Sequence, residues 1–521
     1  MLILSSNLQD EQYSFPACKN IIQKITFSGK KICAIALLSA AVKNVTIEAA
    51  IYSRKGGTLM SIFNDENSVA LHGSTTDLTT GSAAGRILKF SIPIFFGQLL
   101  QMLYNLADAW VIGKFADNNA FAAVSTMGIV TFLIIGFCMG LSVGGSVVIS
   151  RYFGAGDKKN VSSAIHTNYL MAAIFSVAAT AVGLLLTPHL LRWIGTPAQV
   201  MPYALTYLTI YFGGVSTVIF FNVSMSVMRA LGDSLHPLCY LAVSSALNIF
   251  LDLLFVAHPA FRWGVAGAAA ATVISQGVSA LLCILRQCLI RDYTGLDIRR
   301  IRFLPHMMRE VVGLGLPSGI QNAVLTVGNL VVQKNINAFG AHAMSGFGAY
   351  VKIESVVFLP ILSMSMSIPT FVSQNLGAAK YERAKKGASF SIVFGLITAE
   401  AVGIFTYFFA EPLLRIFTTD PSAIKFGLIH SHIVPPFYFL LAFAHCAAGV
   451  MRGCGKAVIP MVNMLAFWCV GRIIYVTVAV SLHPVFQSIS WAYPLAWGLS
   501  DIVFLYCLLK TDWVHNFQNV K

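Results

Sequence analysis

Two aspartates interrupt apolar stretches of this 521-residue chain at the same interval from a proline. Asp108 follows Pro93 by 15 residues (108 − 93), and Asp252 follows Pro237 by 15 residues (252 − 237). In helices that rise about 1.5 Å per residue, each carboxyl group lies roughly 22 Å along its helix, so the two share a depth. Asn248 precedes Asp252 by one helical turn and faces the same side. A carboxylate in a low-dielectric cavity can take up a proton near neutral pH, or hold a desolvated sodium ion together with neutral oxygens. The pattern therefore predicts a proton or sodium site.

The segments that must position these residues occur twice in the chain. MRALGDSLHP, which begins at Met228, is repeated as MRGCGKAVIP at Met451 (451 − 228 = 223), and SRYFGAGDKK at Ser150 is repeated as SQNLGAAKYE at Ser373 (373 − 150 = 223). In an apolar chain, homologous halves are typical of a transporter whose site lies between them.

The repeat also acts as an internal control on the polar residues. Each of them falls on an uncharged position of the second half: Asp108 on Val332, Asn248 on Gly471 and Asp252 on Tyr475. The fold evidently tolerates apolar or absent side chains at these positions. The acids are therefore better explained by a function specific to the first half than by a structural need.

The composition indicates that the chain lies in a membrane. Hydrophobic residues make up 56% of the sequence and charged residues only 11%, whereas about a quarter of the residues of a soluble domain are charged. Each half contains six apolar stretches of roughly 20 residues, long enough to cross a bilayer as helices. They are expected near 88–112, 120–147, 162–187, 203–227, 237–257, 264–287, 311–336, 344–371, 388–409, 427–450, 458–481 and 487–509. We therefore predict an all-α polytopic membrane protein with twelve transmembrane helices in two pseudo-symmetric six-helix lobes.

Three parts of the chain are expected from this pattern. Residues 1–80 do not belong to the repeat and form an N-terminal extension, residues 81–300 form the first lobe, and residues 301–521 form the second. Met60 precedes a polar stretch and offers an alternative start of translation, which leaves open whether residues 1–59 are translated.

The formal charge of +14 needs no nucleic-acid partner, because the basic residues concentrate in alternate loops. One side carries, among others, Arg151, Lys158, Lys159, Arg229, Arg300, Lys385 and Arg452. The other side carries Lys114, Arg192, Arg262, Lys334, Arg415 and Lys425. The positive-inside rule predicts a multi-pass protein of the plasma (inner) membrane with both termini in the cytoplasm.

The motifs NLADAWVIGKF after Pro93, SRYFGAGD, MRALGD, LNIFLD and WGVAGAAAAT closely resemble those of the multidrug and toxic compound extrusion (MATE) family, over about residues 86–510. The resemblance implies antibiotic-resistance efflux of bulky, often aromatic, cationic compounds by antiport, in exchange for protons or sodium ions. It also implies that Asp108, Asn248, Asp252 and Thr272 match the polar cluster at which the coupling cation binds. No further metal site and no other cofactor are expected, and we expect a monomer.

Further polar residues inside the apolar stretches are candidates for the cavity or the substrate site. They are Gln98, Tyr104, Asn222, Glu354 and Glu400. Arg472 is an intramembrane cation that needs a partner, and we interpret it as a structural clamp, because a bare cation would repel cationic cargo.

Two alternatives are weighed against cation efflux. A flippase for lipid-linked saccharides would line its cavity with Arg and Lys, and the spans hold only Lys352 and Arg472 apart from Lys89, Arg286 and Lys334 at their ends. A membrane-embedded enzyme such as a prenyltransferase would need clustered carboxylates for magnesium, and the sequence has no such cluster and no Walker-type loop. We therefore expect a transporter and not an enzyme.

Overall fold

The computed structural model describes residues 77–515 except 194, 259 and 291. Within these residues the regular structure is helical throughout. Most of the extension expected at 1–80, including Met60, lies outside the described residues, and the boundaries at 80 and 300 stay predictions.

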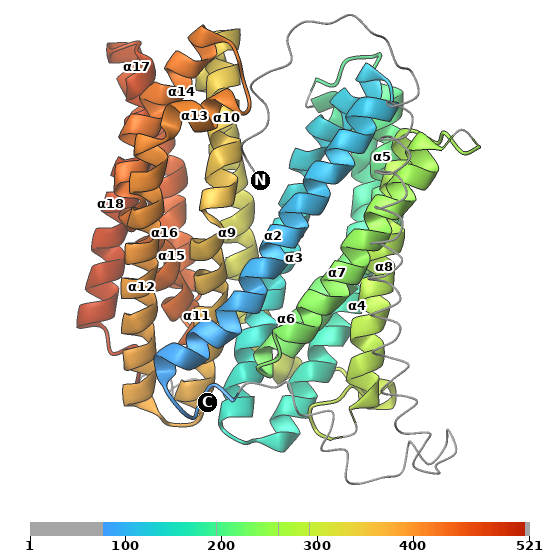
Figure 1. Cartoon of the computed structure of the whole chain (residues 1–521). Helices are drawn as coiled ribbons and strands as arrows, with labels where there is room; N and C mark the ends of the chain where they lie inside the picture. The colour runs from blue at the N-terminus through green and yellow to red at the C-terminus, as the bar shows by residue number, and fades with distance from the viewer. Residues whose placement is uncertain (1–76, 194, 259, 291, 516–521) are drawn as a thin grey trace, which may run out of the picture. The chain divides into compact units, whose positions relative to one another are not determined.

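The helices of the first half, which we call the N-lobe, are α2 (Ala83–Phe115), α3 (Asn118–Gly154), α4 (Lys158–Trp193), α5 (Met201–Gly213), α6 (Val215–Ala230), α7 (Leu235–Asp252) and α8 (Val265–Leu289) (Figure 1).

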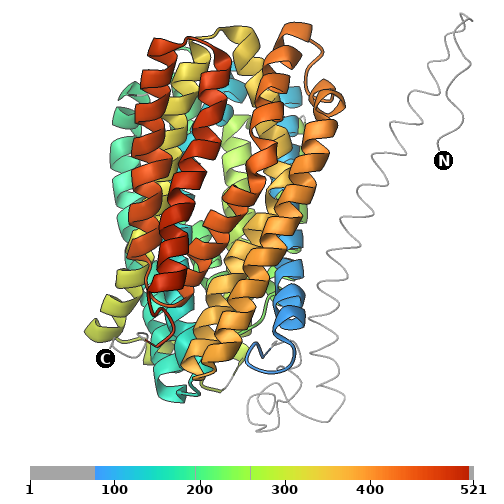
Figure 2. The same ribbon diagram turned by 90° about the vertical axis from the view of Figure 1, so that its left-hand side faces the viewer.

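The helices of the second half form the C-lobe, which faces the viewer in Figure 2. They are α9 (Pro305–Asn337), α10 (Ala341–Val357), α11 (Leu359–Gly377), α12 (Tyr381–Phe408), α13 (Ala410–Arg415), α14 (Pro421–Ile433), α15 (Tyr438–Gly453), α16 (Val458–Met464), α17 (Arg472–Leu482) and α18 (Phe486–Lys510). Two stretches are wound as π-helix, Leu253–Ala257 after α7 and Leu465–Gly471 before α17.

The number of membrane spans agrees with the sequence. Ten helical segments of the described chain are long and apolar enough to cross a membrane, and two bent pairs raise the number to twelve. The pairs are α5 with α6, bent by 48°, and α10 with α11, bent by 46°. Gly214 separates the first pair, where a Cβ atom would lie 2.2 Å from Val273. Pro360 lies in the first turn of α11, where its missing N–H is tolerated. The predicted fold class is confirmed.

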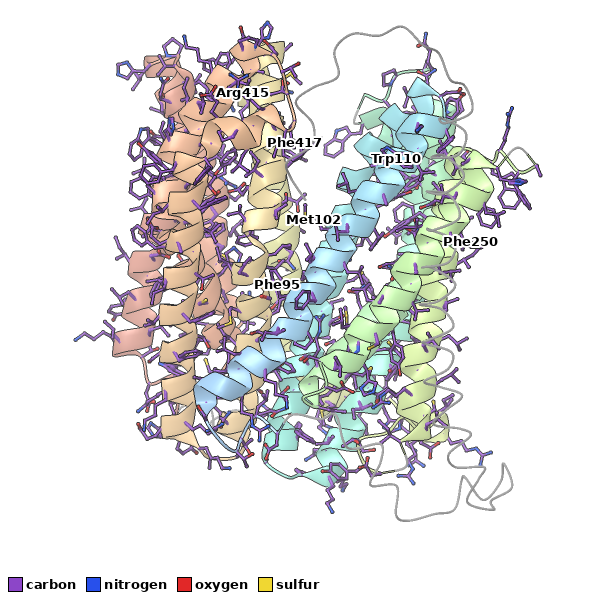
Figure 3. All side chains as sticks on the ribbon, viewed as in Figure 1. Phe95, Met102, Trp110, Phe250, Arg415 and Phe417 are labelled. Atoms are coloured by element: carbon purple, nitrogen blue, oxygen red, sulfur yellow. The ribbon has the colours of Figure 1, made fainter. Side chains whose placement is uncertain are left out.

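Large apolar side chains are exposed on both lobes (Figure 3). Trp110 is 53% exposed, Phe250 48% and Phe417 44%. In water such surfaces would drive aggregation, whereas in a bilayer they contact lipid chains of the same polarity.

The two lobes pack against each other mainly through α3 and α9. A Cβ atom on Gly140 would lie 2.2 Å from the backbone nitrogen of Gly319, and one on Gly144 equally close to that of Gly315. Glycines therefore allow these two helix backbones to touch. At the end of α3 that leads into the turn to α4, Arg151 forms an ion pair with Glu310 of α9.

Helix α2 belongs to the N-lobe but begins against the C-lobe. The carbonyl oxygen of Leu78, just before α2, accepts hydrogen bonds from Asn375 (3.1 Å) and Arg383. Arg383 also donates to the carbonyl of Thr80 at 2.8 Å, and α2 then packs on α11 and α12 before it reaches α7. The helix that carries Asp108 is thus fixed at its start by the opposite lobe (Figure 1).

Candidate functional site

Asp108 of α2 and Asp252 of α7 lie within hydrogen-bonding range of each other. Asp252 is completely buried and Asp108 is half-buried. Among the described residues, Oδ1 of Asp108 and both carboxyl oxygens of Asp252 have no N–H or O–H donor. Two carboxyl groups can hydrogen bond only when one of them carries a proton, because ionised carboxylates only accept. This pair is therefore arranged to share a proton, or to have its charge neutralised by a cation.

Neutral polar groups surround the two acids. Asn248 is 1% exposed, and neither atom of its amide has a hydrogen-bond partner within the described chain. The hydroxyl of Tyr104 lies beside Gln276 of α8 and interacts electrostatically with both aspartates. Each buried polar atom without a partner lowers the stability of the fold by about 1–3 kcal/mol. A cluster of such atoms is therefore expected to bind a ligand that satisfies them. Its oxygens suit a proton, a water molecule or a sodium ion.

The π-helical turn that follows Asp252 helps to explain its position. Asp252 is the last residue of α7, and the chain continues as π-helix over Leu253–Ala257. Such turns are found frequently at functional sites, because they change the direction of side chains within a helix.

Two other predicted residues, Thr272 and Asn222, hydrogen bond within their own helices. The hydroxyl group of Thr272 donates to the carbonyl of Ala268 in its own helix at 3.1 Å. The amide of Asn222 likewise donates to the carbonyl of Val218 at 2.8 Å. A role for Thr272 as a neutral ligand beside the acids, and for Asn222 in the cavity, stays a prediction.

Two residues of this cluster, Gln276 and Tyr207, are not among the residues predicted from the sequence. Gln276, which lies beside Tyr104, follows Thr272 by four residues and therefore lies on the same face of the helix. This spacing could have predicted Gln276 from the sequence. Tyr207 of α5 interacts electrostatically with both aspartates, but nothing in its sequence context distinguished it from other core tyrosines.

Gln98 lies at the contact between the lobes. Its amide nitrogen is 3.0 Å from the sulfur of Met366 in α11. The second half fills the positions equivalent to the acids with packing side chains, since Val332 is 1% exposed and lies in an apolar cluster beside Tyr475. The positions of the second half that align with the two acids therefore serve packing, as the repeat in the sequence indicates.

Arg472 of the C-lobe has partners, as its burial requires. It is 4% exposed, donates to the amide oxygen of Asn329 at 2.8 Å, and stacks over the ring of Tyr493 at 5.0 Å. Glu354 of α10 is half-buried and interacts electrostatically with Arg472, without the direct contact of an ion pair. Glu400 of α12 lies close to the backbone N–H of Phe439, at the start of α15.

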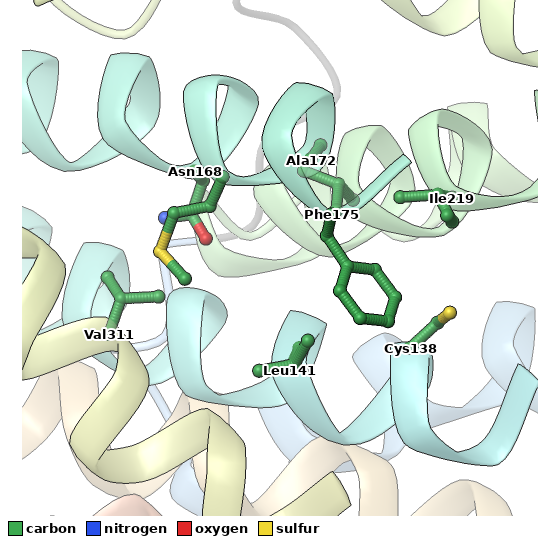
Figure 4. A pocket seen from close by; sticks show the side chains of 9 residues that line it. Cys138, Leu141, Asn168, Ala172, Phe175, Ile219 and Val311 are labelled. Atoms are coloured by element: carbon green, nitrogen blue, oxygen red, sulfur yellow. The ribbon is translucent and has the colours of Figure 1, made fainter. Parts of the chain in front are cut away.

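A small, mostly apolar pocket lies between α3, α4 and α6 of the N-lobe and Val311 of α9 in the C-lobe (Figure 4). Its lining includes Cys138, Leu141, Phe175 and Ile219, with Asn168 as the polar member. None of the candidate site residues lines it. Among the described residues, no group of three or more His, Cys, Asp or Glu side chains is placed to hold a metal ion.

Comparison with known proteins adds independent evidence. A family model described as MatE matches residues 93–254 and 317–477, which are the two halves of the repeat. The chain is 29% identical over 395 residues to a probable multidrug resistance protein, YpnP, of Bacillus subtilis (strain 168), covering 75% of this chain and 87% of that protein. It is 26% identical over 392 residues to a protein of Shewanella oneidensis named FAD transporter, covering 73% and 86%.

Solved structures agree on the fold. A structure described as the outward-facing conformation of a multidrug resistance MATE family transporter of the MOP superfamily superposes with a TM-score of 0.79. The two chains are 22% identical, and the match covers 85% of this chain and 99% of the other.

Proposed function

Because this chain belongs to the MatE family and is a multidrug efflux transporter, not an enzyme, we propose that it exports organic cations in exchange for protons or sodium ions by alternating access. The buried contact between Asp108 and Asp252 is the observation that carries the proposal. A carboxyl pair that needs one positive charge can release that charge when the site opens to the other side of the membrane.

The packing of the lobes supports alternating access. Helices α3 and α9 pack against each other and join the two lobes. The ion pair between Arg151 and Glu310 lies at the end of this contact where the loops are more basic. We infer that this end faces the cytoplasm and that the structure is closed on that side.

Transport of anionic cargo, as in a saccharide-lipid flippase, is less well supported. Arg472 would be the anion-binding group, yet Asn329 and Tyr493 already hold its guanidinium. The name of the Shewanella relative gives the cargo of that protein only.

The test is efflux of a fluorescent organic cation from proteoliposomes under an imposed pH gradient or an imposed sodium gradient, applied separately. We expect one gradient to drive efflux by the wild type, and Asp108→Asn or Asp252→Asn to abolish it. Val332→Ala, at the position equivalent to Asp108, is the matched control and costs packing only. Wild-type rates in a double Asp108→Asn/Asp252→Asn variant would show that these acids do not couple transport.

A further inference from the structure

The connection between the two lobes, residues 292–304, belongs to neither copy of the repeat. We call it the linker. The ranges matched by the family model, 93–254 and 317–477, leave it out. It joins α8, which ends at Leu289, to α9, which begins at Pro305. Both helices are long and apolar enough to cross a membrane, so the linker lies at the level of the membrane surface.

The inner side of the linker is fixed on the N-lobe. Leu296 is buried in the same apolar cluster as Ile165 of α4, and Ile301 packs against this cluster. The backbone N–H of Asp297 donates to Nε2 of His166, a buried side chain of α4, at 3.0 Å. Because these residues are held inward, the side chains between them are left at the surface.

The outer side of the linker combines apolar and basic side chains. Ile298 is 67% exposed and Phe303 is 64% exposed. Arg299, Arg300 and Arg302, which lie beside them in the sequence, are exposed as well. Large apolar side chains are unfavourable in water, whereas the boundary between lipid headgroups and acyl chains accommodates apolar and basic side chains together.

The positive charge of this surface is mostly uncompensated. From residue 297 to residue 309 the chain has four arginines and one aspartate, a net charge of +3 (4 − 1) with His neutral. Arg300 pairs with Asp297 at 3.1 Å. Over the part of the chain that the structure describes, no ion pair involves Arg299, Arg302 or Arg309. A basic cluster directly beside a membrane helix suits negatively charged phospholipid headgroups.

We propose that the outer side of the linker, residues 298–303, binds anionic phospholipid headgroups together with Arg309. The arginines contact the phosphate oxygens, and Ile298 and Phe303 reach between the acyl chains. A soluble anion would use the arginines alone, and an acidic protein would not need apolar side chains at the level of the membrane surface. The proposal depends on neither the cargo nor the coupling ion.

The proposed lipid surface continues into the contact between the lobes. Glu310, which pairs with Arg151 of α3, lies in the second turn of α9, directly after the linker. Headgroups bound at the linker therefore hold the start of α9 at the membrane surface, which should slow the opening of this end of the molecule.

The experiment titrates the delipidated full chain in neutral detergent with phosphatidylglycerol or phosphatidylcholine and measures bound lipid by native mass spectrometry. We expect phosphatidylglycerol to bind about tenfold more tightly than phosphatidylcholine. The triple variant Arg299→Gln/Arg300→Gln/Arg302→Gln should lose this preference, because each arginine beside an anionic headgroup contributes about fivefold. Phe303→Ser should weaken binding of both lipids, whereas Phe303→Leu keeps an apolar side chain and should bind like the wild type.

The matched control removes three positive charges from the same end of the C-lobe. Lys385→Gln/Lys386→Gln/Lys510→Gln changes lysines that are spread over α12 and α18, and should keep the preference for phosphatidylglycerol. An equal loss in this control would indicate general charge attraction and overturn the surface. If the arginine variant does not fold, Arg302→Gln alone, with an expected loss of about fivefold, decides instead.

Two further outcomes would also overturn the proposal. One is a wild type without preference for phosphatidylglycerol, or an arginine variant that keeps it. The other is equally tight binding of glycerol phosphate, which carries the charge without acyl chains and would show a site for free anions.

The effect on α9 is measured by amide hydrogen exchange over residues 305–319. Phosphatidylglycerol should slow this exchange in the wild type and not in the arginine variant. Equal exchange with either lipid would overturn the link between the lipid surface and the contact of the lobes. Efflux is not measured here, so failure of the lipid surface leaves the proposed function intact.

Discussion

At the scale of single residues, Asp108 and Asp252 behave as one unit. Their close approach requires a shared proton or a bound cation, and three of their four carboxyl oxygens lack donors among the described residues. Groups that interact so strongly exchange protons as a pair and not as two independent acids. Asn248, Tyr104 and Gln276 supply neutral dipoles around them, which a bare pair of carboxylates would lack.

We therefore predict non-additive losses. Asp108→Asn and Asp252→Asn should each reduce gradient-driven efflux about as much as the double substitution, because either one removes the shared site. The measurement is the initial rate of efflux from proteoliposomes, normalised to the amount of folded protein. Losses that multiply in the double variant would indicate two independent acids.

A second prediction concerns the tyrosine beside the acids. Tyr104→Phe removes the hydroxyl that lies beside Gln276 and interacts electrostatically with both carboxyl groups, and should lower coupled efflux by about 2- to 10-fold, since a hydrogen bond between neutral groups contributes about 0.5–1.5 kcal/mol. Expression and thermal unfolding should stay close to the wild type. The matched control is Tyr475→Phe in the C-lobe, at the position equivalent to Asp252, which should transport normally.

At the scale of elements, α2 contacts the C-lobe and also carries Asp108 of the acid pair in the N-lobe. Its start is held by Arg383 of the C-lobe, its middle contacts Met366 through Gln98, and Asp108 lies near its far end in the N-lobe. A change of charge at Asp108 therefore acts on a helix that both lobes contact. Such a helix is well placed to relay the charge of the acid pair to the packing between the lobes.

The ion pair between α3 and α9 is predicted to keep one end of the molecule closed. Glu310 also accepts a hydrogen bond from Tyr152 at 3.1 Å, so Glu310→Gln weakens two interactions between the lobes. We expect faster amide hydrogen exchange over residues 305–319, measured by mass spectrometry. Glu382→Gln, which breaks the exposed pair with Lys385, should leave this segment unchanged. Equal exchange in both variants would show that glycine packing alone closes this end.

At the scale of the whole molecule, the charge of the loops should fix the orientation. Lys158, Arg229, Arg300 and Lys385 lie in or next to the loops at one end of the helices, and the positive-inside rule places them in the cytoplasm. Single cysteines at these positions should resist an impermeant thiol reagent in intact cells and react after permeabilisation. A cysteine at Lys425, on the opposite side, should react from outside. The reverse pattern would invert the orientation and the direction of transport.

The twelve spans, the repeat and the common depth of Asp108 and Asp252 could be predicted from the sequence, and the role of these two acids in coupling stays a prediction. Hydropathy and helical periodicity act over short stretches of chain, and the offset of 223 residues compares the halves without any coordinates. Contacts between distant helices followed no such local rule. Three sets of contacts depend on how the helices rotate and bend against one another. Tyr207 and Gln276 lie beside the acids, Thr272 and Asn222 hydrogen bond within their own helices, and Arg472 stacks on Tyr493. These contacts come from the packing of the helices, because glycine contacts, π-helical turns and the two bends of nearly 50° set the directions of side chains far apart in sequence.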